Sequence, residues 1–227
     1  MLDRSSRDAE LREAQGRAMT SPPISTILHH QNAEGAWNGG SYSPKYTSSH
    51  WSMILLAEYG VEGSDARVRL GARRILEDLA EGKGGLAWVF ARDHGASCIP
   101  ASVMRYACAA GFGTDPRLEP LVQRLIRDAK KFDSACWING DQPCAWGYAR
   151  LVWGLSALPE GARTREVERA IRRGVEFLLS YRPEGAEYPA PYGQSYLWRQ
   201  LSFPLFYQAD VLFVLRALDA AEALDDP

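Results

Sequence analysis

The sequence predicts an all-α protein, an α/α toroid of repeated inner and outer helix hairpins with a period of about 50 residues. Three observations indicate this fold: tryptophans recur at that spacing, amphipathic stripes recur in phase with them, and a segment apolar on nearly every side precedes each stripe. We expect one domain over residues 1–227, with an N-terminal helix within 1–20 and the repeats within 21–227. That first helix, at about residues 6–19, should end before Pro22 because proline interrupts helical hydrogen bonding.

The tryptophan repeat sets the period. Trp37, Trp88 and Trp137 follow short turns of small residues and are spaced by 51 and 49 residues. Trp198 comes 61 residues after Trp137, as if the loop at 183–196 carried an insertion. We expect the first three tryptophans to staple adjacent repeats.

The outer helices are predicted from three amphipathic stripes, which begin at Val68, Leu118 and Val167, 50 and 49 residues apart. Arginines occupy the opposite faces, so each helix should have one buried and one wet side. The residues just before each stripe suit helix starts, with these candidates for N-caps and a first-turn proline: Ser64, Thr114, Thr164 and Pro116.

The inner helices are predicted at residues 50–59, 98–110 and 144–158, each of which precedes one stripe. A helix that is apolar all round is buried on both flanks, so these segments should line the inside of the ring. A fourth segment, 206–224, has the same character but no amphipathic partner after it.

Composition excludes several classes of protein. The net charge of −2 and the pI of about 6.1, without a basic half, argue against a nucleic-acid partner. The N-terminus has acids and no apolar run, so we expect no secretory signal, and no window is apolar enough to span a membrane. Four cysteines without an export signal are expected to be reduced thiols in a cytoplasmic protein.

Residues 31–37 read Q-N-A-E-G-A-W and resemble the Q-x-x-D-G-x-W signature of the prenyltransferase and squalene oxidase repeat. Residues 45–51, 143–147 and 203–207 are similar to an uncharacterised bacterial branch of that terpenoid cyclase-like superfamily. The resemblance extends from about residue 17 to the C-terminus. It implies a toroid that holds an isoprenoid, or another apolar small molecule or lipid, in a central cavity, with cyclase-like or prenyltransferase-like activity as the enzymatic form.

Departures from the family pattern leave catalysis open. The D-x-D-D acid motif of the cyclases is absent, since Asp225 and Asp226 follow Leu224. The D-x-C zinc motif of protein prenyltransferases fails by spacing, since Asp133 precedes Cys136 by three residues. The relatives close their ring with about six hairpins, whereas this chain has about three and a half. The ring is therefore incomplete, truncated, or completed by a second copy in a homo-oligomer.

The repeat also predicts a metal site. His50, Cys98 and Cys144 enter successive inner helices at spacings of 48 and 46 residues, and Cys136 lies in the loop before the third. Parallel inner helices would bring these residues to one mouth of the ring, where imidazole and thiolate suit zinc. The alternative is that the cysteines pack as small hydrophobic residues.

Aromatic side chains on the inner segments are the candidates for ligand binding. Their faces would stabilise a cation in a dry cavity, or they would simply fill the core. The candidates are Trp51, Tyr106, Trp146, Trp153 and Tyr207.

Charged residues near apolar segments are the remaining candidates. Asp210 and Asp141 are the candidate catalytic acids, because a buried carboxyl has a raised pKa. Paired carboxylates would also suit a glycosidase, although no spacing singles out a pair. Arg105, Arg150 and Arg216 interrupt inner helices, and a buried arginine needs an anion, either Asp210 in an ion pair or a ligand phosphate.

Three functions remain open. The first is a toroid that binds an isoprenoid or other apolar ligand. The second is a non-catalytic helical-repeat module for a protein partner, which the absent acid motif and the short ring favour. The third is zinc-dependent prenyl-transfer or thiol chemistry at His50 and the three cysteines.

Overall fold

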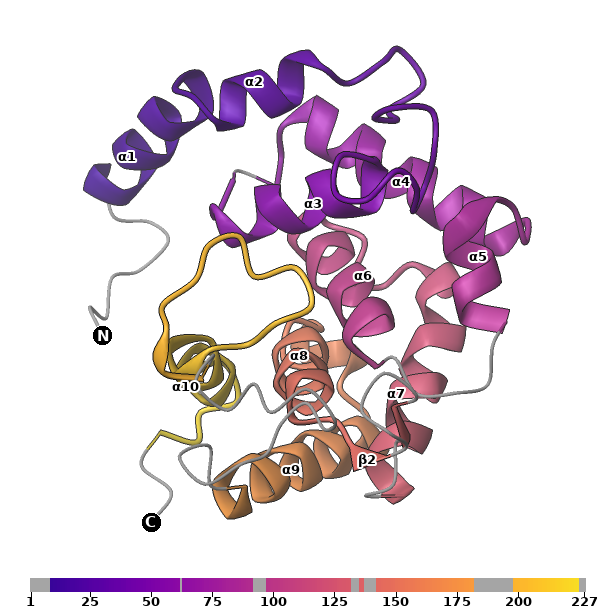
Figure 1. The fold of residues 1–227 in the computed structure, drawn as a ribbon, viewed down its shortest axis with the longest axis vertical. Coiled ribbons are helices and arrows are strands. Elements are labelled where there is room, and N and C mark those ends of the chain that lie inside the picture. The colour runs from indigo at the N-terminus through magenta and orange to yellow at the C-terminus, as the bar shows by residue number, and fades with distance from the viewer. Residues whose placement is uncertain are drawn as a thin grey trace. The chain divides into compact units, whose positions relative to one another are not determined.

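The computed structural model describes residues 9–61, 63–91, 97–131, 135–136, 142–181 and 198–224 (Figure 1). Helices account for most of them. Two short strands within the described ranges, β1 (Ala135–Cys136) and β2 (Gln142–Pro143), pair antiparallel. The all-α class predicted from the sequence is therefore confirmed.

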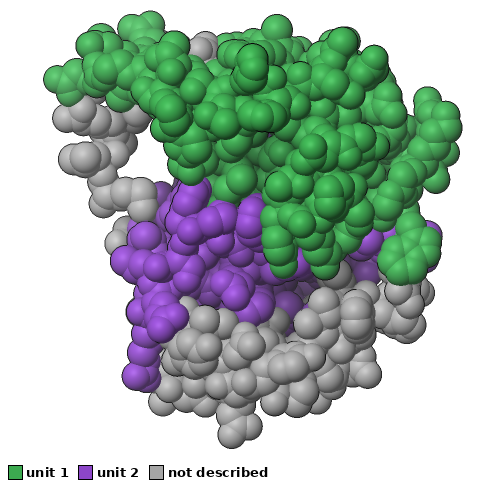
Figure 2. Space-filling view, turned by 45° about the horizontal axis from the view of Figure 1, so that its top comes forward, with its two compact units in different colours: residues 1–88, 109–111 green, residues 89–108, 112–227 purple. Residues whose placement is uncertain are grey.

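The chain divides into two compact units (Figure 2). Unit 1 comprises residues 1–88 and 109–111, and unit 2 comprises residues 89–108 and 112–227. The helix α5 (Gly84–Ala91) lies across this boundary in the sequence.

Unit 1 is built on a buried helix and an amphipathic one. Its helices are α1 (Ala9–Thr20), α2 (Ile24–His29), α3 (Ser49–Glu58) and α4 (Ala66–Ala80). α3 packs against α4, as the predicted inner and outer pair requires. Gly71 of α4 makes this packing close: a Cβ there would lie 2.8 Å from the ring of Trp37 and 2.9 Å from the sulfur of Met53. The ring of Trp37 therefore packs directly against α4.

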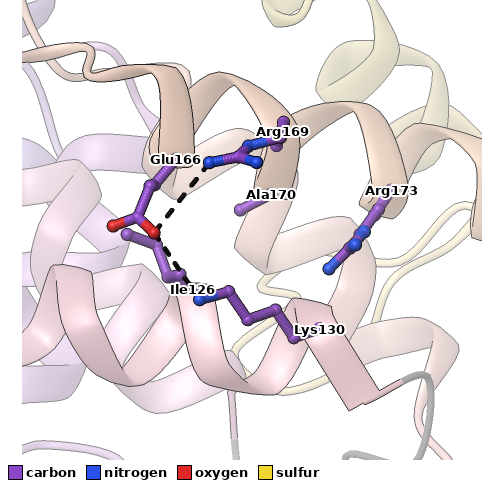
Figure 3. A pocket seen from close by; sticks show the side chains of 6 residues that line it. All are labelled: Ile126, Lys130, Glu166, Arg169, Ala170 and Arg173. Carbon is purple, nitrogen blue, oxygen red and sulfur yellow. Dashed lines mark ion pairs between the residues drawn. The ribbon is translucent and has the colours of Figure 1, made fainter.

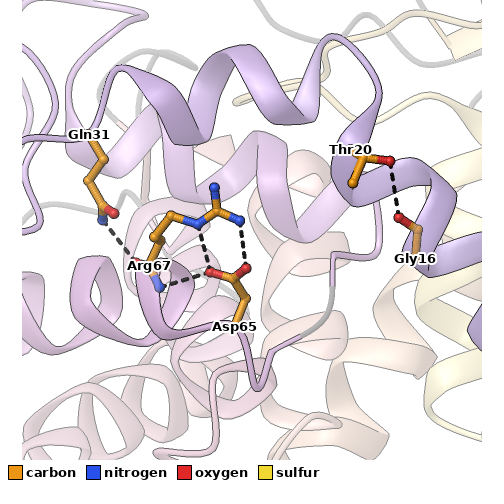
Figure 4. A network of polar contacts seen from close by, with 5 residues as sticks. All are labelled: Gly16, Thr20, Gln31, Asp65 and Arg67. Atoms are coloured by element: carbon orange, nitrogen blue, oxygen red, sulfur yellow. Dashed lines mark hydrogen bonds and ion pairs between the residues drawn. The ribbon is translucent and has the colours of Figure 1, made fainter.

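Side-chain hydrogen bonds tie the turn before Trp37 to the start of α4 (Figure 4). The Nε2 of Gln31 donates to the carbonyl of Arg67 at 2.9 Å. Asp65 accepts from the backbone N–H of Arg67 at 2.8 Å and from its guanidinium at 2.7 Å. In α1, the hydroxyl of Thr20 donates to the carbonyl of Gly16 at 3.4 Å. The Gln and Trp of the repeat signature thus have structural roles here.

The N-caps differ by one residue from two of the three predictions. Asp65, not Ser64, caps α4, and Asp115, not Thr114, caps the first helical turn after it in unit 2. An aspartate is the cap in both cases because its carboxylate accepts the backbone N–H of the arginine two residues later and also pairs with the guanidinium of that arginine. The third prediction, Thr164, is confirmed: it is the N-cap of the helix at Arg165–Ser180.

Unit 2 is arranged around one central helix. α8 (Ala145–Leu155) lies among α6 (Cys98–Ala109), α7 (Glu119–Lys131), α9 (Arg165–Ser180) and α10 (Val211–Ala220) (Figure 1). Single turns of 3-10 helix precede α7 (Pro116–Leu118) and α9 (Glu160–Ala162), and Pro116 occupies the first turn as expected.

Glycines allow neighbours to approach α8 closely. A Cβ on Gly154 would lie 2.5 Å from the carbonyl oxygen of Ala101 in α6. A Cβ on Gly174 of α9 would lie 2.5 Å from a methyl group of Val152. Residues 147–155 are consequently all buried, which explains why the segment is apolar on every side.

Two expectations about local structure were wrong. Trp88 lies inside α5 and is 60% exposed, so it does not staple repeats. The fourth apolar segment becomes helical only at Val211, because Asp210 is the N-cap of α10. In the ranges described, no helix combines the length and apolarity that crossing a membrane requires.

Candidate functional site

Three arginines surround the indole of Trp153 in unit 2. The guanidinium carbon lies 4.6 Å from the ring centre for Arg105, 5.6 Å for Arg150 and 5.8 Å for Arg216. These side chains come from α6, α8 and α10. We call Arg105, Arg150, Trp153 and Arg216 the arginine–tryptophan cluster, and it forms because α8 lies between the other two helices.

Burial strengthens the electrostatics of this cluster. Arg150 is fully buried, 4.1 Å from the ring centre of Phe213, and its Nη2 donates to the carbonyl of Gln208 at 3.4 Å. Burial lowers the pKa of Arg105, and the positive charge of Arg216 lowers it further. Like charges therefore lie close together in a medium that screens them weakly.

We expected an ion pair between Asp210 and one of these arginines, and this was wrong. No salt bridge joins them in the described part of the chain. Asp210 instead accepts from the backbone N–H of Phe213 at 2.8 Å and of Ser202 at 3.1 Å. It is 3% exposed and fixes the start of α10 to the preceding loop. This candidate acid is thus held as a helix cap.

A cavity of about 240 Å³ adjoins the cluster, and we call it the α10 cavity. Its wall is mostly apolar, and Arg216 and Asp210 supply charge at its lining. The apolar lining residues are Leu201, Phe203, Leu205, Leu212 and Phe213. One side chain, that of Arg216, therefore belongs both to the cavity and to the arginine–tryptophan cluster.

Large apolar side chains are exposed on and beside α10. Leu201 is 72% exposed and Phe203 53%, and Val211, Leu212 and Leu215 are each exposed by more than two fifths. We call these five residues the C-terminal apolar patch. Contiguous apolar surface of this kind marks a binding surface for a ligand or a partner.

The aromatic candidates separate into buried and half-buried residues. Trp51, Tyr106 and Trp153 are at most 3% exposed and fill the cores of their units. Trp51 donates its indole N–H to the carbonyl of Tyr42 at 2.7 Å. Trp146 and Tyr207 are half-buried in unit 2.

The proposed zinc ligands are distributed over both units. His50 lies in α3 of unit 1, with its ring 4.9 Å from that of Trp51. Cys98, Cys136 and Cys144 belong to unit 2. Among the described residues there is no group of three or more histidine, cysteine or acidic side chains placed to hold a metal ion.

Within unit 2, Cys136 acts electrostatically on Cys98. Cys98 begins α6, and the Cys144 sulfur caps α8 by accepting from the N–H of Gly147 at 3.2 Å. Burial raises the pKa of the Cys98 thiol to about 12, with the neighbouring Cys136 adding to the effect. A thiol with such a pKa is neutral at physiological pH and is a poor nucleophile. All four cysteines are unbridged.

A polar network that sequence reasoning missed lies near these cysteines. Asp128 accepts from the hydroxyl of Ser97 at 2.8 Å and pairs with Arg124 at 3.0 Å. The Arg124 and Asp128 spacing of four residues within one helix was the available sequence signal. The other candidate acid, Asp141, lies outside the described residues.

A second, smaller pocket of about 80 Å³ lies between α7 and α9 (Figure 3). Lys130 and Arg169 both reach Glu166, at 3.7 and 4.0 Å, while Arg173 points into the pocket from the next turn of α9. The Glu166 carboxylate already neutralises part of this charge, and both ion pairs are solvent-exposed. It is the weaker candidate because exposed ion pairs interact weakly.

No family model, no curated protein and no solved structure matches this chain. The resemblance to the prenyltransferase and squalene oxidase repeat consequently rests on its motif residues alone.

Proposed function

We propose that unit 2 binds an isoprenoid or another apolar chain in the α10 cavity. The observation that carries the proposal is the apolar wall of this 240 Å³ space, continuous with exposed leucine and phenylalanine side chains. Burying apolar surface is the main driving force for such binding. On this proposal the helices belong to an α/α toroid of the prenyltransferase and squalene oxidase repeat type. The order of buried and amphipathic helices, α3 and α4 followed by α8 and α9, supports it.

Catalysis is not part of the proposal. The chain has no D-x-D-D motif, and Asp210, although it lines the cavity, already accepts backbone N–H groups from Phe213 and Ser202 as a helix cap. Binding, transport or presentation of the apolar ligand is sufficient to account for the site.

The test is displacement of a neutral solvatochromic dye by farnesol, measured for the wild type and for Leu212→Asp. Leu212 lines the cavity, so a carboxylate there should weaken farnesol binding by about tenfold or more. Leu179→Asp is the matched control, because Leu179 is 44% exposed against 46% for Leu212 but lies on α9 away from the cavity lining. Equal affinity in the two variants, or no farnesol binding by the wild type, would overturn the proposal.

A protein-interaction module is the second candidate, and one observation favours it. Val211 and Leu215 are one helical turn apart on α10 and exposed, yet neither lines the cavity. This candidate predicts that Val211→Asp with Leu215→Asp abolishes capture of a partner while farnesol affinity is unchanged.

A further inference from the structure

Two arginines of the cluster lack a carboxylate partner in the described chain. Arg105 and Arg216 are both half-buried, and their contacts there are with the Trp153 ring and, electrostatically, with each other. Cation–π contact offsets only part of the cost of removing a guanidinium from water. Because the charge of Arg216 acts on Arg105, the two groups together leave positive charge that no carboxylate in the described chain compensates.

The nearest acid does not complete the site. Both oxygens of Asp210 accept backbone N–H groups, from Ser202 and Phe213, and this fixes the carboxylate at the end of α10. By contrast, Arg67 in α4 and Arg117 in the 3-10 turn before α7 each pair with the aspartate two residues earlier. Arg105 and Arg216, which are half-buried, have no such carboxylate partner in the described part of the chain.

We propose that Arg105 and Arg216 bind an oxyanion, a phosphate or carboxylate, that forms the head of the apolar ligand. The inference rests on the proposed function, because it places the tail of the same molecule in the α10 cavity. Arg216 lines that cavity and also lies against Trp153, so a head group paired with it stands where the apolar wall begins. Guanidinium groups bind both oxyanions through paired N–H donors.

The position of Trp153 explains why arginine is used. Its flat ring offers an aromatic surface to the guanidinium groups of Arg105 and Arg216, whose carbons lie 4.6 and 5.8 Å from the ring centre. Lysine would supply charge but neither the planar stacking nor the paired donors. Arg150, fully buried behind the same ring, adds to the positive potential.

The experiment compares three ligands with one tail and different heads: farnesyl monophosphate, farnesoate and farnesol. Dissociation constants are measured by calorimetry for the wild type, Arg216→Gln and Arg105→Gln. In the wild type at least one of the anionic ligands should bind about tenfold or more tightly than farnesol, because a charge-assisted hydrogen bond is stronger than a neutral one. Each glutamine variant should lose this advantage, so that its affinity for the anionic ligands falls by far more than its affinity for farnesol. Which anion binds better identifies the head group as phosphate or carboxylate.

Arg172→Gln is the matched control, since Arg172 is exposed on α9 and the variant should bind all three ligands as the wild type does. Arg216→Lys should keep part of the preference for the anions. If Arg105→Gln does not fold, the dissociation constants of Arg216→Gln alone test the proposal. Farnesol binding without an advantage for either anion, or an advantage that survives Arg216→Gln, would overturn the oxyanion site and leave the apolar cavity standing. If the wild type does not bind farnesol but binds inorganic phosphate, the apolar cavity is overturned and the oxyanion site is left standing.

Discussion

The guanidinium of Arg105 in α6 lies 4.6 Å from the centre of the Trp153 ring in α8. This contact joins two helices that the sequence marks only as apolar segments, and it places a cation inside the second unit. With Arg216 on the other neighbouring helix, it turns a core tryptophan into the support of a charged site.

Replacing Trp153 should destabilise the fold and not only the site. Trp153 is 3% exposed, and truncation to alanine should lower the free energy of unfolding by about 3–5 kcal/mol. Trp153→Phe keeps an aromatic face for the arginines and should cost roughly 1–2 kcal/mol. Urea denaturation followed by circular dichroism measures both. Equal stability of the two variants would show that the ring is not part of the core.

Two glycine-to-alanine changes, one where α6 and α8 approach closely and one in the open helix α1, should have opposite effects on stability. Gly154→Ala places a Cβ against the backbone oxygen of Ala101 and should destabilise by about 1–3 kcal/mol. Gly16→Ala, in a helix with no atom within 4 Å of the new Cβ, should stabilise by up to about 1 kcal/mol. Thermal melting of the two variants decides the matter. A neutral Gly154→Ala would mean that the two helices are further apart in solution.

Two helix caps predict how stability depends on acid. Hydrogen bonds from Arg67 and Arg117 lower the pKa of Asp65 and Asp115 respectively. Because the unfolded value is about 3.9, each contribution is complete above that pH and is lost as pH falls through the lowered folded value. Asp65→Asn and Asp115→Asn keep a capping oxygen but no charge, so their unfolding free energies should fall less steeply between pH 5 and pH 2, as checked in urea.

The control for the loss of stability between pH 5 and pH 2 is Asp219→Asn, because Asp219 is exposed on α10. This variant should follow the wild-type pH dependence. An unchanged slope in the Asp65 and Asp115 variants would contradict the arginine pairing of these caps.

Cys98, the half-buried cysteine at the start of α6, should be unreactive. Burial raises the pKa of Cys98 to about 12, so at pH 8 almost none of it is thiolate. Iodoacetamide labelling of the native protein, mapped by peptide mass spectrometry, should modify Cys98 far more slowly than in urea. Rapid native labelling would indicate a lowered pKa at this thiol.

Metal analysis separates this neutral thiol from the zinc hypothesis. A zinc-bound thiolate is also protected from alkylation, but it becomes reactive when a chelator removes the metal. The neutral thiol predicts slow labelling with and without chelator. Stoichiometric zinc that disappears in Cys98→Ser would instead support the metal site.

The helices were predictable because burial imposes a period on the sequence. The stripe that begins at Val167 and its cap Thr164 were both found, since a mostly wet outer helix has a clear 3.6-residue pattern. The helix α5 was missed because Gly84 and Gly85 favour a turn and the residues after them are uniformly apolar. Trp88 was misplaced for the same reason.

The site was predictable only in part. Three arginines that interrupt apolar helices are visible in the sequence, and so is their need for an anion. Their convergence on Trp153 depends on which helices are neighbours, and that is a property of packing. The α10 cavity depends on a loop, where Leu201 and Phe203 have no period to reveal which side they face.

The most direct measurement of the central claim is photoaffinity mapping with a farnesyl phosphate that carries a diazirine on its tail. Peptide mass spectrometry should locate the crosslinks within residues 201–216, and excess farnesyl phosphate should suppress them. The same labelling should be much weaker in Arg216→Gln and unchanged in Arg172→Gln. Crosslinks that fall elsewhere in the chain, or that are undiminished in Arg216→Gln, would contradict the account.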